Sequence, residues 1–316
     1  MKIKLQVTSC KLQVPDPNLK ARASATFNLQ PSTFNRCCAF TLIEVLVVVT
    51  LLAFIIIALM GVFSATQTAF RASVTQTDVL ESGRAAMNLI TGDLRAMSSS
   101  HGTNDGPLNF SVTTYGYPSL NQPLIASGGS RTNVLQNLFI LSQANLNGVP
   151  TWYGTGYAVL LTPSNTYSLY RFSTNHPVAQ AGAAYNLFHT AYLNFLNDPD
   201  NHSHLLDGVV GFRIHAFDTD GRLISYTNNV IHTNSLLNQP REIGYFFYSN
   251  AIPAAVEIEM ATLEDRTLQR AESRPFDLPL PYPNDSRTTY LEGQAGKLHI
   301  FRQRIAIPNV DPAAYQ

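Results

Sequence analysis

Residues 39–63 read AFTLIEVLVVVTLLAFIIIALMGVF, and this stretch decides how the chain is organised. Its apolar run begins after Glu44, and no residue between Glu44 and Arg71 carries a formal charge. A helix needs about 20 predominantly apolar residues to cross the hydrocarbon core of a bilayer. The stretch is therefore long enough to span a membrane, and we place the membrane segment at about residues 45–63.

The charges on the two sides of this segment differ in sign. The 316-residue chain has 21 Lys or Arg and 21 Asp or Glu side chains, but residues 1–39 hold six of the basic side chains and one acid, Asp16. Basic residues beside a membrane segment favour the cytoplasmic side. We therefore expect residues 1–39 to stay in the cytoplasm and residues 71–316 to form a net acidic domain on the outer side.

The three cysteines, Cys10, Cys37 and Cys38, all lie in the basic segment 1–39. If that segment is removed, the working domain has no thiol, which excludes a disulfide scaffold, a cysteine-based zinc site and a cysteine nucleophile. Charged residues make up 13% of the chain and their signs balance, so there is no general cationic field. Because nucleic-acid binding depends largely on neutralising phosphates, no nucleic-acid partner is expected.

The order of the N-terminal signals is unusual. An ordinary secretory signal places a small-residue cleavage site after the apolar stretch. Here that site would fall near Phe63-Ser64-Ala65, where the bulky Phe63 makes a poor substrate. A better small-residue site lies before the apolar stretch, at Cys38-Ala39. A cut there would leave the apolar helix as the new N-terminus, beginning at Phe40.

Residues 39–48, AFTLIEVLVV, resemble the cleavage and methylation motif of type IV pilins and of the pseudopilins of type II secretion. The family pattern is Gly, Phe, Thr-Leu-Ile-Glu and then an apolar run, so Ala39 stands where the family usually has glycine. The leader of residues 1–39 is also long for the family. The resemblance implies cleavage between Ala39 and Phe40 by a prepilin peptidase, usually with N-methylation of Phe40. It further implies a bacterial inner-membrane protein whose outer domain lies in the periplasm or at a filament tip.

Glu44 lies at the edge of the apolar run. A carboxylate at this depth is expensive and is usually a functional group with a partner, although it can also simply lie among the headgroups. Cleavage after Ala39 would create a partner, the amino terminus of Phe40, about one helical turn away. In the pilin family the corresponding glutamate is thought to pair with the terminal amine of a neighbouring subunit. The resemblance therefore implies an assembly role for Glu44.

A helical pattern continues beyond the apolar run. Apolar residues recur there at spacings of three, four, six or seven, namely Phe70, Val74, Leu80, Met87, Ile90, Leu94 and Met97. These spacings are typical of an amphipathic helix. We predict one helix over residues 40–97, with its first half in the membrane or a filament core and its second half packed on a sheet.

Residues 98–316 read mainly as strands, with one short helix at 181–197. Residues 256–260 alternate apolar and acidic side chains, as in a strand with one buried and one solvent-exposed face. Asp218-Thr219-Asp220-Gly221 predicts a hairpin turn. The strands we predict are 134–141, 157–161, 167–172, 209–217, 222–226, 242–248, 255–263 and 297–305. The expected fold is α+β and pilin-like, a long N-terminal helix packed on an antiparallel β-sheet domain, with a leader at 1–39, the helix at 40–97 and the mainly-β domain at 98–316.

The outer domain carries a second resemblance on shorter strings. Residues 206–213 and 252–258, which flank the Asp218–Gly221 turn, are similar to the C-terminal half of the minor pseudopilin called the J subunit. Residues 84–87 and 93–95 on the helix are similar to it as well. Because these strings are loosely specified, they are also compatible with a pilus-associated minor pilin that has a similar large domain.

The sequence carries no motif of a common enzyme class. It has no Gly-x-Ser-x-Gly elbow, no P-loop, no Gly-x-Gly-x-x-Gly and no His-Glu-x-x-His. We therefore expect no enzymatic activity and no cofactor. Trp152, Tyr153 and Tyr157 could form a recognition patch, although aromatics in a sheet protein are more often buried.

Two clusters contain residue types that bind metals. The first lies in the run 197–204 and consists of Asp198, Asp200, His202 and His204. A polar run with a proline is more typical of a loop before a strand. The second is Asp218 with Asp220, whose oxygens on a tight glycine turn suit calcium. Because a third acid and a distal glutamate are missing, a plain turn is the better interpretation of this pair.

These patterns predict a structural and interaction protein. The leading hypothesis is a minor pseudopilin or pilin-like subunit that assembles into a type II secretion pseudopilus or a type IV pilus-like filament. Its partners would be a prepilin peptidase, other pseudopilin or pilin subunits and the inner membrane. The alternative is an uncleaved single-pass membrane protein whose outer domain binds a ligand, senses one or hydrolyses a substrate. A surface pilin for adhesion or DNA uptake is a third possibility, and the acidic mature charge argues against its binding DNA.

Overall fold

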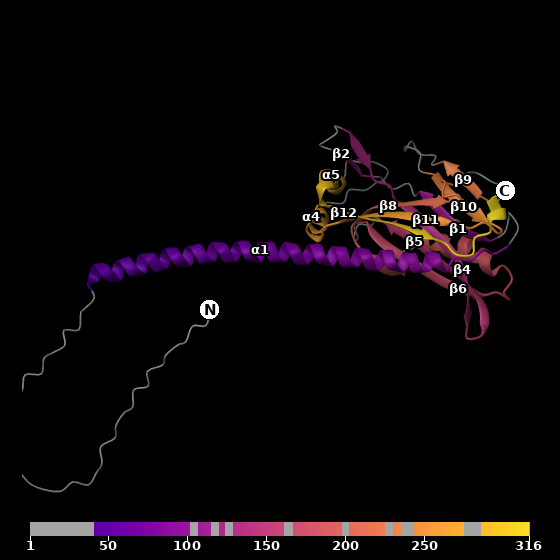
Figure 1. Ribbon diagram of the computed structural model, residues 1–316. Coiled ribbons are helices and arrows are strands. Elements are labelled where there is room, and N and C mark those ends of the chain that lie inside the picture. Colours follow the sequence, from indigo (N-terminus) through magenta and orange to yellow (C-terminus); the bar gives the residue numbers. More distant parts are fainter. Residues whose placement is uncertain are drawn as a thin grey trace, which may run out of the picture. The chain divides into compact units, whose positions relative to one another are not determined.

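A 54-residue helix, α1 (Leu42–Arg95), begins the part of the chain that the structure describes (Figure 1). The computed structural model describes residues 41–101, 107–114, 120–123, 129–160, 167–197, 202–224, 230–234, 243–274 and 286–315. The leader 1–39, Phe40, Asp198 and Asp200 lie outside these residues. The predicted helix over 40–97 is confirmed from Leu42 to Arg95, whereas Met97 forms a β-bridge with Ser142 instead. By its internal packing, the chain from Phe63 onward forms one compact unit, which includes the second half of α1.

The larger sheet has seven antiparallel strands. In spatial order they are β7 (Ser203–Leu206), β6 (Ser168–Pro177), β5 (Val149–Leu160), β4 (Gln136–Leu146), β1 (Leu108–Thr114), β10 (Ile243–Tyr248) and β9 (Val230–Asn234). β4 and β5 are joined by Asn147 and Gly148, both of which have positive φ angles, 51° and 82°. An Asn-Gly pair with two positive φ angles suits the tight turn that matches the twist of the flanking strands. The two strands therefore form a long continuous hairpin.

A second sheet has three antiparallel strands in the order β12 (Leu298–Ala306), β11 (Ala255–Leu263) and β8 (Val209–Phe217). β2 (Asn121–Pro123) and β3 (Ser130–Thr132) form a separate two-stranded ribbon. The start of β4 touches β8, because the Phe212 N–H donates to the Val134 carbonyl at 2.7 Å and the Ile214 N–H donates to Gln136 Oε1 at 2.6 Å. These hydrogen bonds join the two main sheets at the start of β4.

The remaining helical elements are short. α2 (Ala183–Asn186), a π-helical turn (Leu187–Tyr192) and α3 (Leu193–Asn197) follow one another without a break and confirm the helix predicted at 181–197. α4 (Asp265–Glu272) follows β11, and α5 (Ser286–Glu292) precedes β12. The three-residue 3-10 turn η3 (Ala295–Lys297) leads into β12, and η4 (Pro312–Tyr315) closes the described chain.

Two apolar cores lie on the two faces of the larger sheet. The main core gathers Ile90 of α1, Leu138 of β4 and Ile258 of β11, among many others, so that both main sheets and the helix share it. The second core lies on the opposite face, where Phe139 of β4 packs against Tyr192 of the π-helical turn with ring centroids 5.1 Å apart. Neighbouring residues 138 and 139 point to different cores, as expected when side chains alternate along a strand. The prediction of an α+β fold with a long helix packed on antiparallel sheets is confirmed.

One predicted strand is wrong in its described part. Residues 222–224 do not form a strand, and only Leu223 makes a bridge, to Phe217. The physical reason is that the open edge of β8 is already used in its middle, where it bonds to the start of β4. The predictions also omitted β1, β7, β9, α4 and α5, and they ended β4 too early and began β5 too late.

Candidate functional site

The first turn of α1 is held by a reciprocal set of hydrogen bonds between Thr41 and Glu44. Glu44 Oε2 accepts hydrogen bonds from the Thr41 backbone N–H and from the Thr41 hydroxyl, each at 2.9 Å. In return, the Glu44 N–H lies 3.4 Å from Thr41 Oγ1. This is the capping-box arrangement, in which a Thr at the helix start and a Glu three residues later satisfy each other's free backbone donors. The Glu44 carboxylate is therefore turned back toward the start of the helix, onto Thr41.

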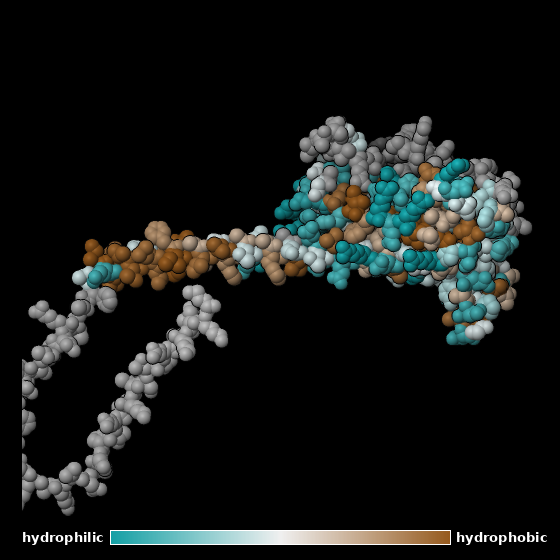
Figure 2. Space-filling view, in the orientation of Figure 1, coloured by the Kyte–Doolittle hydropathy of each residue, from teal (hydrophilic) through white to brown (hydrophobic). Residues whose placement is uncertain are grey.

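The first half of α1 presents a mostly apolar surface. Every residue from Thr41 to Arg71 is exposed, and the large apolar side chains of this stretch are between 48% and 84% exposed. Figure 2 shows mostly hydrophobic colours on the visible face of this part of α1. Among the described residues α1 is the one helix long and apolar enough to cross a membrane. A surface of this size is stable only when lipid or another apolar helix covers it.

The second half of α1 is anchored in the main core. Met87, Ile90, Leu94 and Met97 are almost completely buried. Gly83 faces the Phe301 ring of β12, and a Cβ atom at position 83 would lie 2.3 Å from Phe301 Cζ. The stripe predicted on α1 is therefore correct from Met87 onward. It is wrong at Phe70 and Val74, which are 70% and 42% exposed, because the described sheets do not extend along that part of the helix.

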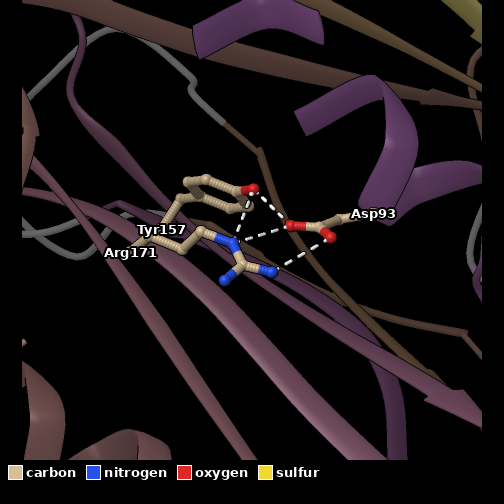
Figure 3. A network of polar contacts seen from close by, with 3 residues as sticks. All are labelled: Asp93, Tyr157 and Arg171. Atoms are coloured by element: carbon tan, nitrogen blue, oxygen red, sulfur yellow. Dashed lines mark hydrogen bonds and ion pairs between the residues drawn. The ribbon is translucent and has the colours of Figure 1, made fainter. Parts of the chain in front are cut away.

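Three polar side chains fix the end of α1 on the larger sheet (Figure 3). Arg171 of β6 binds both carboxylate oxygens of Asp93 on α1, with Nε at 2.9 Å from Oδ2 and Nη2 at 3.1 Å from Oδ1. The Tyr157 hydroxyl of β5 donates to Asp93 Oδ2 and accepts from Arg171 Nε at 3.2 Å. Burial raises the pKa of Tyr157, and the negative charge of Asp93 raises it further. Two-point Arg–carboxylate contacts add geometric specificity, so this network sets how α1 lies on the sheet.

Sequence reasoning did not single out this network. Asp93 lies in the string 93–95, whose resemblance assigns it no partner, and Arg171 lies in a strand with no charged neighbour. One signal was available, because Arg171 is the single Asp, Glu, Lys or Arg residue between 132 and 197. An isolated charge in such a neutral segment calls for a partner from elsewhere in the chain.

The predicted metal candidates do not come together in the described part of the chain. His202 packs against the rings of Phe172 and Phe195, whereas His204 lies 2.7 Å from Asp207. The described residues contain no group of three or more His, Cys, Asp or Glu side chains placed to hold a metal ion.

Asp218 and Asp220 lie in the predicted turn. The Asp218 carboxylate accepts a hydrogen bond from the Arg222 N–H at 2.8 Å, and the Gly221 N–H donates to the Asp218 carbonyl at 3.1 Å. Gly221 has a φ angle of 78°. The Asp218 carboxylate thus stabilises the turn, in agreement with the interpretation that the sequence favoured.

The aromatic cluster of residues 152–157 is mostly internal. Tyr157 is fully buried in the main core and Trp152 is 9% exposed in the second core, with Tyr153 half-buried between them in sequence. A surface recognition patch built on Trp152 and Tyr157 is therefore excluded, and the interpretation as buried sheet aromatics is correct.

Comparison with known proteins assigns the N-terminal segment. Residues 34–60 match the family model described as the prokaryotic N-terminal methylation motif. The chain carries a prepilin-type N-terminus. No curated protein matches the whole sequence. Among solved structures, a type IV-like pilin from Thermus thermophilus aligns with 73% of this chain and 96% of its own, at 11% sequence identity and a TM-score of 0.33.

Proposed function

We propose that this chain is a pilin-like subunit that a prepilin peptidase cuts between Ala39 and Phe40 and that assembles through α1 into a filament. The observation that carries the proposal is the methylation motif at 34–60 running directly into a helix whose apolar surface is exposed on all sides. The motif explains why the apolar segment is retained after processing, and the uncovered surface requires a lipid or helix partner.

Glu44 is proposed to neutralise the amino terminus of Phe40, in the same or a neighbouring subunit. Its carboxylate already accepts the N–H of Thr41, the residue that would follow the new terminus. A charged amine in a low-dielectric helix bundle costs far less when a carboxylate pairs with it. Van der Waals packing of the apolar halves of α1 would supply the remaining attraction between subunits.

The finer assignment within this class is a minor pseudopilin of a type II secretion system, similar to the J subunit. The large mainly-β domain and the strings at 206–213 and 252–258 support this assignment. The domain would then lie in the periplasm or at the filament tip and determine which sister subunits are neighbours. The proposed role needs no catalytic chemistry and no cofactor.

The deciding experiment is the intact mass and N-terminal sequence of the membrane-extracted protein, with and without a co-expressed prepilin peptidase. A chain that begins at Phe40, with or without a methyl group, supports the proposal. A leader that persists with the active peptidase would instead favour an uncleaved single-pass protein whose outer domain binds a ligand.

The role of Glu44 is tested by Glu44→Ala in the full chain. We expect the variant to be cut and folded but to be missing from sheared filaments, because the Phe40 amine then lacks its counter-charge. Glu81→Ala is the matched control, since Glu81 is exposed on the same helix outside the apolar half. Normal incorporation of Glu44→Ala would remove Glu44 from the assembly mechanism.

A further inference from the structure

A cleft of about 220 Å³ opens where α1 meets β7 and the turn from β11 into α4. Its apolar lining comes from Val79 of α1, from Leu205 and Leu206 of β7, and from Leu263 of β11. Val79 and Leu263 are buried, whereas the two β7 leucines are only half-buried. The cleft is therefore an apolar recess that stays partly open beside the helix.

The rim of this cleft is acidic. Asp78, Asp207 and Asp265 line it and are exposed, and His204 is the one lining residue that can become cationic. His204 is already engaged, with Nε2 at 2.7 Å from Asp207 Oδ1. Burial raises the pKa of the nearby Glu272, and the charges of Asp207 and Asp265 raise it further, against the opposing effect of Arg287. The rim therefore favours a group that combines a positive charge with apolar surface.

Such a group is present on α1 itself, at residues 70–74, just before the residues of α1 that line the cleft. Phe70, Arg71 and Val74 are all exposed, and no other Lys or Arg lies between Phe40 and Arg84. Two exposed apolar side chains beside a single arginine match the cleft in chemistry. They are also the two positions of the helical stripe that the chain's own sheets leave uncovered.

We propose that the cleft receives the segment Phe70–Val74 of α1 from a second copy of this chain, with Arg71 facing Asp78 of the recipient. The proposal rests on the proposed function, because helices anchored in one membrane by their N-terminal halves run parallel. Arg71 and Asp78 are seven residues apart, which is about 10.5 Å along a helix. A parallel copy shifted by about two turns therefore brings one copy's Arg71 level with the other's Asp78.

The apolar donor and acceptor residues lie on different sides of α1. At about 100° per residue, Phe70 and Val74 point well away from Val79, which faces the domain. Arg71 and Asp78, seven residues apart, lie on one side of the helix, within about 20° of each other. The contact joins two different surfaces of the two copies and is therefore of the head-to-tail kind.

The first test exchanges charges between two differently tagged full-length chains. Arg71→Asp alone and Asp78→Arg alone should each lower co-capture of the two tags from detergent extracts, by about two- to fivefold for an exposed ion pair. Co-expression of the Arg71→Asp chain with the Asp78→Arg chain should restore it, because one of the two pairings then regains opposite charges. Arg84→Asp is the matched control and should leave co-capture unchanged. Loss that the mixed pair does not restore would overturn the proposal.

The second test does not depend on charge. Cys10, Cys37 and Cys38 are replaced by Ser, and Val74→Cys and Ser82→Cys are placed on separate chains, since Ser82 lines the cleft. Oxidation in membranes should give several-fold more dimer from the mixture than from either single-cysteine chain. Equal dimer from the single-cysteine chains would mean that the copies lie level, which overturns the proposal.

N-terminal sequencing of the same samples separates the two proposals. A chain that begins at Phe40, forms filaments and yields no mixed dimer keeps the proposed function and overturns the cleft contact, leaving a sister subunit as the neighbour at this position. A chain that retains its leader and still yields the mixed dimer keeps the contact and overturns the processing proposal.

Discussion

The two halves of α1 belong to one continuous helix but are stabilised in opposite ways. In the first half every side chain is exposed; Leu52, for example, is 55% exposed. Most residues of this half are apolar. In the second half the residues are mixed, and Ile90 and Leu94 are completely buried. The second half is stabilised within the chain, whereas the first half depends on lipid or on other helices.

This difference explains why composition alone is a poor guide to the core. The most apolar part of the chain contributes nothing to the main core, and the helix turns that contain Asn88, Thr91 and Asp93 contribute Met87, Ile90 and Leu94. A helix that is apolar all round needs a surrounding apolar medium, whereas an apolar stripe needs one flat partner. Mutations that act on one half should therefore leave the other half unaffected.

The largest effect on the domain should come from Leu94→Ala. Leu94 is fully buried in the main core, so the substitution removes apolar contacts and leaves a cavity. We expect the free energy of unfolding of the mainly-β domain to fall by about 3 kcal/mol. The measurement is urea unfolding of the detergent-extracted full chain, followed by the fluorescence of Trp152, which lies in the second core.

Leu52→Ala is the matched control for this prediction. It makes the same chemical change on the same helix, but at a residue that no described part of the chain covers. Its unfolding midpoint should equal that of the unchanged chain. An equal loss of stability in both variants would mean that the first half also packs on the domain.

The next largest effect should come from Asp93→Leu, which removes the carboxylate that binds Arg171. The guanidinium would remain on the sheet with the Tyr157 hydroxyl as its side-chain partner among the described residues, and the Arg171 side chain is 23% exposed. We expect a loss of about 2 kcal/mol, less than for a fully buried pair because solvent screens part of the charge. The double variant Asp93→Leu with Arg171→Met should recover most of the loss, as apolar replacements of an ion pair often do. A double variant as unstable as Asp93→Leu would show that Asp93 acts through other contacts.

The helix was predictable because its sequence patterns extend over many consecutive residues. A charge-free run and a 3.6-residue stripe can be read directly from residues 45–97, and both depend on neighbours along the chain. β8 and β11 were also predicted at their observed bounds, because residues 209–217 and 255–263 alternate clearly. The Glu44 position was found from the motif, but its bonds to Thr41 required coordinates.

The strands that were missed or shortened lack that alternation. Most residues of β1 and the first six of β4 are buried, because these central strands have an apolar core on each face. Buried and exposed positions therefore do not alternate along them, and their sequences carry no two-residue period. The Asn147-Gly148 pair does mark a hairpin, and using it would have extended β4 and β5 toward each other. The Asp93 network joins residues 64 and 78 positions apart, which no local pattern can predict.

Alkaline pH should weaken the second half of α1 and spare the first. Burial raises the pKa of Tyr157 above its ordinary value near 10, so the folded domain favours the neutral phenol. Stability is therefore complete below about pH 10 and is lost as the pH rises further, because the unfolded tyrosine ionises first. One such group costs about 1.4 kcal/mol per pH unit. Urea midpoints between pH 8 and 11 should fall less steeply for Tyr157→Phe, and identical slopes would contradict this assignment.

The smallest effects should come from two glycines of α1 that meet different surroundings. Nothing lies within 4 Å of a Cβ atom built on Gly92, whereas one on Gly83 would strike the Phe301 ring. Alanine is the better helix former by about 1 kcal/mol, so Gly92→Ala should stabilise the domain by about that amount. At Gly83 the same gain competes with displacement of the ring, which typically costs about 1–3 kcal/mol.

Gly83→Ala should therefore be neutral or destabilising by about 1 kcal/mol, measured by the same urea unfolding. Combining it with Phe301→Leu should reverse the sign, because the smaller side chain frees the space that the new methyl group needs. Gly61→Ala completes the comparison, since its Cβ atom would also meet nothing within 4 Å but lies in the first half of the helix. It should leave the unfolding of the domain unchanged. If Gly83→Ala and Gly92→Ala stabilised the domain equally, the close contact of α1 with β12 at Phe301 would be wrong, and the anchored half of the helix would begin later than Gly83.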